Sequence, residues 1–199
     1  MTIRLAFFSV EDLPSDLGEL LGALPFGEDD RKKLLAIKNP VALQHSLAAR
    51  LALLSLCPDG DRTIFSTEHG KPYFSADGAP YFSLSHSGGL AVAALSNEPC
   101  GVDLEVFRDR LDANALAKRF FSEKDQAALN SHGDFLALWT KKEAVTKLLG
   151  IPLTETLSKQ NTYPTRTYRD GSFTLSLAAE REFSVKFQGL SYPFKEIFL

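Results

Sequence analysis

The sequence predicts an α+β protein made of two similar halves, which meet near Pro99–Gly101. Three observations support this fold class. Short stretches in which apolar and polar residues alternate are typical of β-strands, and longer stretches with apolar residues three and four positions apart are typical of helices. The order strand, helices, strands occurs before the seam, and a looser version of the same order follows it. We therefore expect residues 1–99 and 100–199 to form the two halves.

The composition is that of an ordinary globular protein, with 199 residues, of which 44% are hydrophobic and 24% charged. A net charge of −3 gives no general attraction to nucleic acids or acidic membranes. No stretch is long enough to span a membrane, and the apolar run at residues 3–8 is too short for a signal peptide. Cys57 and Cys100 match neither a disulfide framework nor a zinc site, so we expect reduced thiols in a cytoplasmic protein.

The first half is predicted to begin with a strand at residues 1–8, followed by three helices. The first helix ends at Pro25 and Gly27, and its apolar face consists of Leu17, Leu20, Leu21 and Leu24. The second helix begins at Asp29, with acidic residues before basic ones, an order that the helix dipole favours. Residues 41–57 have the period of a core-facing helix. Read alone, the basic residues of the second helix fit a solvated turn better than a phosphate site; they are Arg31, Lys32 and Lys33.

Three strands are predicted at residues 82–87, 90–95 and 101–105, and their short connections suggest a meander. Before them, Gly70 and Pro72 hold Lys71 in a rigid loop. Ser85 and His86 end the first strand beside the Gly88-Gly89 turn, where backbone N–H groups can bind an anion. The alternative for His86 is a structural side chain with its hydrogen bonds satisfied inside the protein.

Asp103 and Glu105 lie on the same face of the third strand, because side chains alternate between the two faces. Two carboxylates this close repel each other unless one is protonated or a cation lies between them. Oxygen ligands without histidine or cysteine suit Mg²⁺, or Mn²⁺ as a second choice. The alternative is a solvated face of an amphipathic strand, since Asp-x-Glu alone is common.

The second half is predicted to contain helices at 112–120, after Ser122, and at 135–149, where Gly150 ends the last helix. Strands follow at residues 162–168, 173–177 and 183–187. On the long helix, Trp139, Glu143 and Lys147 form one stripe at four-residue spacing. Taken alone, Glu143 and Lys147 fit an exposed ion pair. Lys142 projects toward the apolar arc, so its ammonium group needs a partner.

Together these residues resemble the 4'-phosphopantetheinyl transferases, in particular the longer, Sfp-like type. Five blocks between residues 70 and 150 carry the resemblance: Gly70-Lys71-Pro72, Phe82-x-x-Ser85-His86-Ser87, Gly101-Val102-Asp103-x-Glu105, Phe120-Phe121-Ser122-x-x-Asp125 and Trp139-x-x-Lys142-Glu143-Ala144-x-x-Lys147. The resemblance implies a pseudo-twofold fold in which each half is a small antiparallel sheet packed with a long helix. The active site would lie in the cleft between the halves.

The same resemblance implies an enzyme that transfers the 4'-phosphopantetheine arm of coenzyme A to a serine hydroxyl of an apo carrier protein, releasing adenosine 3',5'-bisphosphate. Asp103, Glu105 and Glu143 would bind Mg²⁺, with Glu143 or Glu105 as the general base and Lys147 stabilising charge on the phosphates. The residues expected to contact the phosphates of coenzyme A are Lys71, Ser85, His86 and Lys142, with Arg31 and Lys33 at the 3'-phosphate. The family often has an arginine near Gln44-His45-Ser46, and this chain has none there.

Two alternatives belong to other classes of protein. A binding module for coenzyme A or a carrier protein would keep the basic residues but lose a carboxylate, and this chain has all three. A magnesium-dependent phosphohydrolase would cleave coenzyme A without a carrier protein. The carrier could serve fatty acid, polyketide or nonribosomal peptide synthesis. Because both halves lie in one chain, we expect a monomer. We also expect it to be cytoplasmic and to have no nucleic acid or membrane partner.

Overall fold

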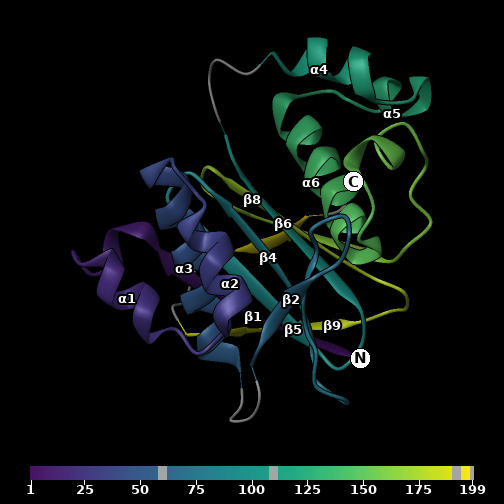
Figure 1. The fold of residues 1–199 in the computed structure, drawn as a ribbon. Helices are drawn as coiled ribbons and strands as arrows, with labels where there is room; N and C mark the ends of the chain where they lie inside the picture. Colours follow the sequence, from purple (N-terminus) through teal and green to yellow (C-terminus); the bar gives the residue numbers. More distant parts are fainter. Residues whose placement is uncertain (58–61, 108–111, 190–193, 198–199) are drawn as a thin grey trace.

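The computed structural model describes residues 1–57, 62–107, 112–189 and 194–197 (Figure 1). The helices are α1 (Leu17–Ala23), α2 (Glu28–Leu35), α3 (Pro40–Leu56), α4 (Ala113–Phe120), α5 (Glu123–Ala127) and α6 (His132–Leu149), with 3₁₀ turns at Val10–Asp12 and Leu153–Glu155. The strands are β1 (Thr2–Ser9), β2 (Ile64–Ser66), β3 (Pro72–Phe74), β4 (Tyr81–Ser87), β5 (Leu90–Ser96), β6 (Cys100–Val106), β7 (Thr165–Asp170), β8 (Phe173–Ala179), β9 (Ser184–Gln188) and β10 (Lys195–Ile197).

The helices separate into two groups on either side of the strands. In Figure 1, α1, α2 and α3 lie on one side and α4, α5 and α6 on the other. Side-chain caps define several helix starts. Ser122 caps α5, as the sequence predicts, and Asn39 accepts bonds from the first turn of α3. Gly150 ends α6 in the left-handed conformation, with a φ of 66°.

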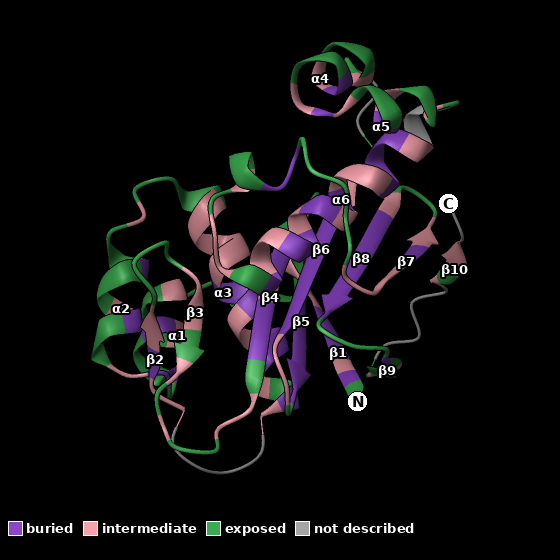
Figure 2. Cartoon of the chain, turned by 90° about the vertical axis from the view of Figure 1, so that its right-hand side faces the viewer, coloured by how far each residue is buried: buried purple, intermediate pink, exposed green. Residues whose placement is uncertain are grey.

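Two four-stranded sheets form the centre. The first has the order β4-β5-β1-β9, and α3 covers its outer face. The second has the order β10-β7-β8-β6, and α6 covers β6 and β8. Figure 2 shows β5, β6 and β8 buried along nearly their whole length. The inner faces of the sheets share one apolar core, which includes Ile3, Leu5, Val92, Val102, Leu104, Leu175 and Leu177. The predicted α+β class is therefore confirmed.

Gly101 brings α6 close to β6. A Cβ atom on this residue would lie 1.9 Å from the carbonyl oxygen of Ala144 and 2.6 Å from the backbone nitrogen of Leu148. No side chain fits such a gap, so only glycine permits this approach. The close contact places the stripe of α6 that carries Glu143 and Lys147 against the strand that carries Asp103 and Glu105.

One expectation about strand pairing is wrong, and one strand of the second half joins the first sheet. β4 and β5 pair as predicted, but β6 pairs with β8 rather than β5, so the three strands do not form a meander. The strand predicted near residues 183–187 pairs in parallel with β1, Thr2 opposite Ser184, and thereby joins the first sheet. Local alternation identifies a strand and its buried face, whereas the neighbour of a strand is decided by contacts distant in sequence.

Candidate active site

Three carboxylates from two elements converge at one place. Asp103 and Glu105 lie on β6, Glu143 lies on α6, and one oxygen of each falls within 4.8 Å of the others. Asp103 is 2% exposed, and its Oδ2 atom is buried without a hydrogen-bond partner among the described residues. A buried carboxylate oxygen without a partner is costly, so it points to a ligand that the site can accept.

Lys147 supplies the positive charge at this cluster. Its Nζ atom lies 2.6 Å from Asp103 Oδ1 and 2.8 Å from the hydroxyl oxygen of Ser85. Lys147 and Glu143 are four residues apart on α6, which is the stripe that the sequence predicts. With all groups ionised, three carboxylates and one ammonium group leave a net charge of −2. Oxygen donors with this charge fit a divalent cation such as Mg²⁺ or Mn²⁺.

The pKa of Glu143 is raised above its usual value. Burial raises its pKa to about 7, and the negative charges of Asp103 and Glu105 act in the same direction. Lys147 and a hydrogen bond from Trp139 oppose the shift. A carboxyl group that titrates near neutral pH can accept a proton during a reaction, and an acid-base role therefore suits this position.

Ser85 and His86 point in different directions from β4, as alternation requires. The Ser85 hydroxyl donates a 2.8 Å hydrogen bond to Asp103, so it lies at the carboxylate cluster. The ring of His86 stacks on that of His45 from α3, with centroids 5.0 Å apart. Although His86 is exposed as a residue, partial desolvation lowers its pKa, and His45 and Lys147 lower it further. His45 was not predicted as a site residue; the available signal was its place in the stretch Gln44-His45-Ser46.

Lys71 reaches from the loop before β3 to the C-terminal end of α6. Its Nζ atom donates a 2.7 Å hydrogen bond to the carbonyl oxygen of Leu148, and burial lowers its pKa. Lys71 and Lys147 line the same cavity of about 270 Å³, together with Ser83 and Gly150. This cavity brings a residue from each half of the chain together. None of the three carboxylates lines it, and its link to the cluster is Lys147.

Arg31 and Lys33 lie on α2. Arg31 donates to the carbonyl oxygen of Gly22 at 3.1 Å and lies 3.7 Å from Glu28, while Lys33 is exposed. A closer ion pair in this region, which was not predicted from the sequence, joins Arg50 of α3 to Asp30 of α2. The Nε atom of Arg50 donates to Asp30 at 2.6 Å, and Asp30 is 2% exposed. This pair fixes α2 on α3.

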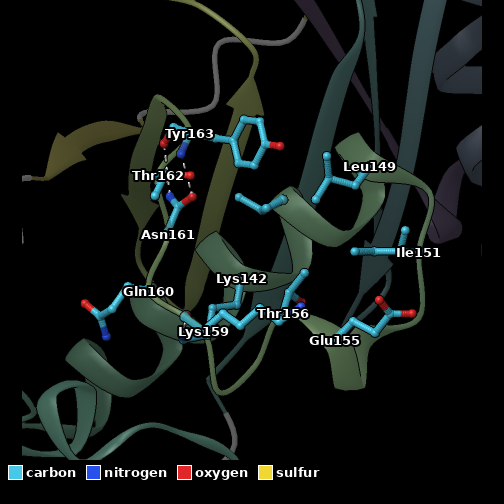
Figure 3. Close-up of a pocket in the computed structure, with 11 residues that line it drawn as sticks. Lys142, Leu149, Ile151, Glu155, Thr156, Lys159, Gln160, Asn161, Thr162 and Tyr163 are labelled. Carbon is cyan, nitrogen blue, oxygen red and sulfur yellow. Dashed lines mark hydrogen bonds between the residues drawn. The ribbon is translucent and has the colours of Figure 1, made fainter.

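Lys142 lies in a closed network, away from the carboxylates. Its Nζ atom is 2.9 Å from Asp125, donates at 2.7 Å to the carbonyl oxygen of Lys159, and lies over the ring of Phe121. The residue is 2% exposed. It borders a separate cavity of about 220 Å³, lined by α6 and by the chain that follows it (Figure 3), and none of the three carboxylates lines that cavity. These contacts favour a structural role for Lys142.

The described helices include none with the length and apolar character needed to cross a membrane.

The chain is similar to known proteins. Residues 99–196 match the family model described as the 4'-phosphopantetheinyl transferase superfamily. The chain is 36% identical over 156 residues to 4'-phosphopantetheinyl transferase psf-1 of Bacillus pumilus, covering 75% of this chain and 61% of that protein. It is 36% identical over 104 residues to 4'-phosphopantetheinyl transferase AcpT of Salmonella typhimurium, covering 49% of this chain and 54% of AcpT. The chain thus spans between half and two thirds of the length of these relatives.

Proposed function

Because the chain belongs to the 4'-phosphopantetheinyl transferase superfamily, we propose that it transfers the 4'-phosphopantetheine arm of coenzyme A to a serine hydroxyl of an apo carrier protein. Adenosine 3',5'-bisphosphate is the second product. The observation that carries the proposal is the convergence of Asp103, Glu105 and Glu143 beside Lys147. Phosphoryl transfer depends mainly on positioning and on electrostatic stabilisation, and this cluster offers both.

Asp103, Glu105 and Glu143 would hold Mg²⁺, with Mn²⁺ as a second choice. The Oδ2 atom of Asp103, buried without a partner in the described part of the chain, and the net charge of the cluster support this assignment. When bound, the cation would neutralise charge on the pyrophosphate of coenzyme A.

The protein's own groups have distinct roles in this proposal. Glu143 or Glu105 removes the proton from the attacking serine hydroxyl. Lys147 stabilises the negative charge that grows on the phosphate oxygens and the leaving group. The hydrogen bond from Lys147 to Asp103 holds its ammonium group beside the carboxylates.

Lys71, Ser85 and His86 would contact the phosphates of coenzyme A from the first half of the chain, with Arg31 and Lys33 toward the 3'-phosphate. The position of Lys71 beside Lys147 in one cavity supports its part in this set. Lys142 was predicted to join these contacts, but its bonds to Asp125 and Lys159 favour a structural role.

The proposed partner is an acyl or peptidyl carrier protein, and the proposed working form is a cytoplasmic monomer whose halves are residues 1–99 and 100–199. The test is to mix the protein with coenzyme A, Mg²⁺ and a panel of apo carrier proteins and to measure intact masses. A carrier that gains one phosphopantetheine group supports the proposal. Cleavage of coenzyme A without carrier modification would indicate a phosphohydrolase, and binding without any reaction would indicate a binding module.

A further inference from the structure

Three serines alternate along β4, and each accepts a hydrogen bond from a backbone N–H group of β6. Ser83 accepts from Val102 at 3.1 Å, Ser85 from Leu104 at 3.2 Å and Ser87 from Val106 at 3.2 Å. All three serines are buried. We refer to Ser83, Ser85 and Ser87 as the serine ladder.

The serine ladder joins the edges of the two sheets. β4 is the edge strand of the first sheet and β6 that of the second. Because β6 pairs with β8 on one side, the N–H groups of Val102, Leu104 and Val106 point to the other side, toward β4. Each step of two residues along β4 matches a step of two along β6, so the strands run in parallel. The serine oxygens therefore accept hydrogen bonds from N–H groups that would otherwise be exposed to solvent on an edge strand.

Two members of the ladder also donate to the carboxylate cluster. Ser85 donates to Asp103 Oδ1 at 2.8 Å, and Ser87 donates to Glu105 Oε2 at 2.7 Å. A serine hydroxyl carries a single hydrogen and accepts through its lone pairs. Since the backbone of β6 donates to the oxygen, the hydrogen is left for the carboxylate. The ladder thus sets the rotation of both carboxylates relative to the strand that carries them.

The register provides an internal comparison at Ser83. Ser85 and Ser87 each contact the carboxylate of the residue just before their N–H partner on β6. For Ser83 the corresponding residue is Gly101, which has no side chain. Ser83 therefore makes the contact to the backbone of β6 but has no carboxylate to hold at the equivalent position.

We propose that Ser87, together with Ser85, is a positioning residue that orients Glu105 and Asp103 to receive a divalent cation. The inference rests on the proposed metal site and adds the groups that hold its ligands in place. Partners of metal ligands fix the orientation of those ligands, and their removal weakens metal binding by about 10- to 100-fold.

The experiment measures Mn²⁺ binding by calorimetric titration and by electron paramagnetic resonance, in the absence of coenzyme A. Ser87→Ala should weaken Mn²⁺ binding by about 10- to 100-fold. The control is Ser83→Ala, which loses the equivalent backbone contact and should bind Mn²⁺ as the wild-type protein does. Both variants should lose similar thermal stability. Ser87→Thr keeps a hydroxyl group and should retain most of the affinity.

Equal Mn²⁺ affinity in the wild-type protein and Ser87→Ala would overturn the inference, as would an equal loss in Ser83→Ala and Ser87→Ala. If Ser87→Ala does not fold, Ser87→Thr and Ser87→Val provide a pair of similar volume, and only the threonine variant should bind tightly. A wild-type protein that binds no Mn²⁺ would refute the metal site itself, and the inference with it. Normal wild-type binding with no effect at position 87 would refute the positioning role alone.

Discussion

Lys147 of α6 donates a 2.6 Å hydrogen bond to Oδ1 of Asp103 on β6, and the other oxygen of Asp103 is buried without a partner among the described residues. One carboxylate thus has one oxygen neutralised by the protein and one open to a ligand. The contact also joins the helix that carries Glu143 to the strand that carries Glu105. Lys147 holds the cluster together through this contact, and we propose that it also stabilises charge on the substrate.

Replacement of Lys147 by methionine should separate these roles. Lys147→Met keeps the apolar stem but leaves buried Asp103 without its cation, and we expect a loss of about 2 kcal/mol in the free energy of unfolding without metal. Mn²⁺ should bind at least as tightly as to the wild-type protein, because a repelling charge has gone. Turnover should fall by about 100-fold or more. Denaturation, calorimetric titration and a transfer assay measure the three effects; unchanged turnover would exclude Lys147 from the reaction.

The metal-free protein should lose stability as pH rises from about 4.5 to about 7. Folding raises the pKa of Glu143 from 4.5 to about 7, so the folded state binds more protons than the unfolded state across this range. The free energy of unfolding must therefore decrease with pH there. Glu143→Gln should flatten this slope, and Mg²⁺ should restore stability to the wild-type protein at pH 8. Chemical denaturation in EDTA across the pH series measures the effect; an identical slope in Glu143→Gln would contradict it.

Substitution of Lys142 should mainly reduce stability, whereas substitution of Lys71 should mainly weaken coenzyme A binding. The sequence predicts phosphate contacts for both. Lys142→Met leaves Asp125 in a mostly buried site without its cation, and should cost about 3–5 kcal/mol of stability. Lys71→Ala should instead weaken coenzyme A binding, with a smaller salt dependence than the wild-type protein, because phosphate contacts of partly exposed cations are screened. Thermal unfolding and calorimetric titration at two salt concentrations distinguish them. If Lys142→Met kept full stability but bound coenzyme A more weakly, Lys142 would be a phosphate contact after all.

The protein should act as a monomer, because both sides of the proposed site come from one chain. Lys71 and His86 belong to the first half, whereas Asp103, Glu143 and Lys147 belong to the second. Sedimentation at concentrations used for activity should give the mass of one chain, 21.9 kDa. Specific activity should not change on dilution. Loss of specific activity as a dimer dissociates would show that the site needs two chains.

Local patterns in the sequence predicted the carboxylate cluster because each part has a regular period. Alternation places Asp103 and Glu105 on one face of a strand, and four-residue spacing places Glu143 and Lys147 on one stripe of a helix. The resemblance to a known family then predicted that Asp103, Glu105 and Glu143 share one metal site, so that strand and helix lie close together. The close approach of these elements depends on Gly101, whose importance is visible only once Ala144 is placed against it.

Contacts between distant elements were not predictable in the same way. Alternation shows that β6 has a polar face, but it does not show that β8 and the serines of β4 are its neighbours. Lys142 was expected to need a partner, and in the structure its ammonium group lies 2.9 Å from Asp125, in the capping motif of α5. The stacking of His45 on His86 depends on how α3 packs on β4. Local sequence patterns do not predict this packing.

Transfer of phosphopantetheine by variants of the cluster tests the central claim most directly. Wild-type protein, Asp103→Ala and Glu143→Ala would each be mixed with coenzyme A, saturating Mg²⁺ and a carrier protein that the wild-type protein modifies, and intact masses followed over time. We expect the wild-type protein to add one phosphopantetheine group to the carrier, and both folded variants to add none. Near wild-type turnover in either variant would contradict the assignment of Asp103, Glu105 and Glu143 as the metal-binding centre of the proposed transferase.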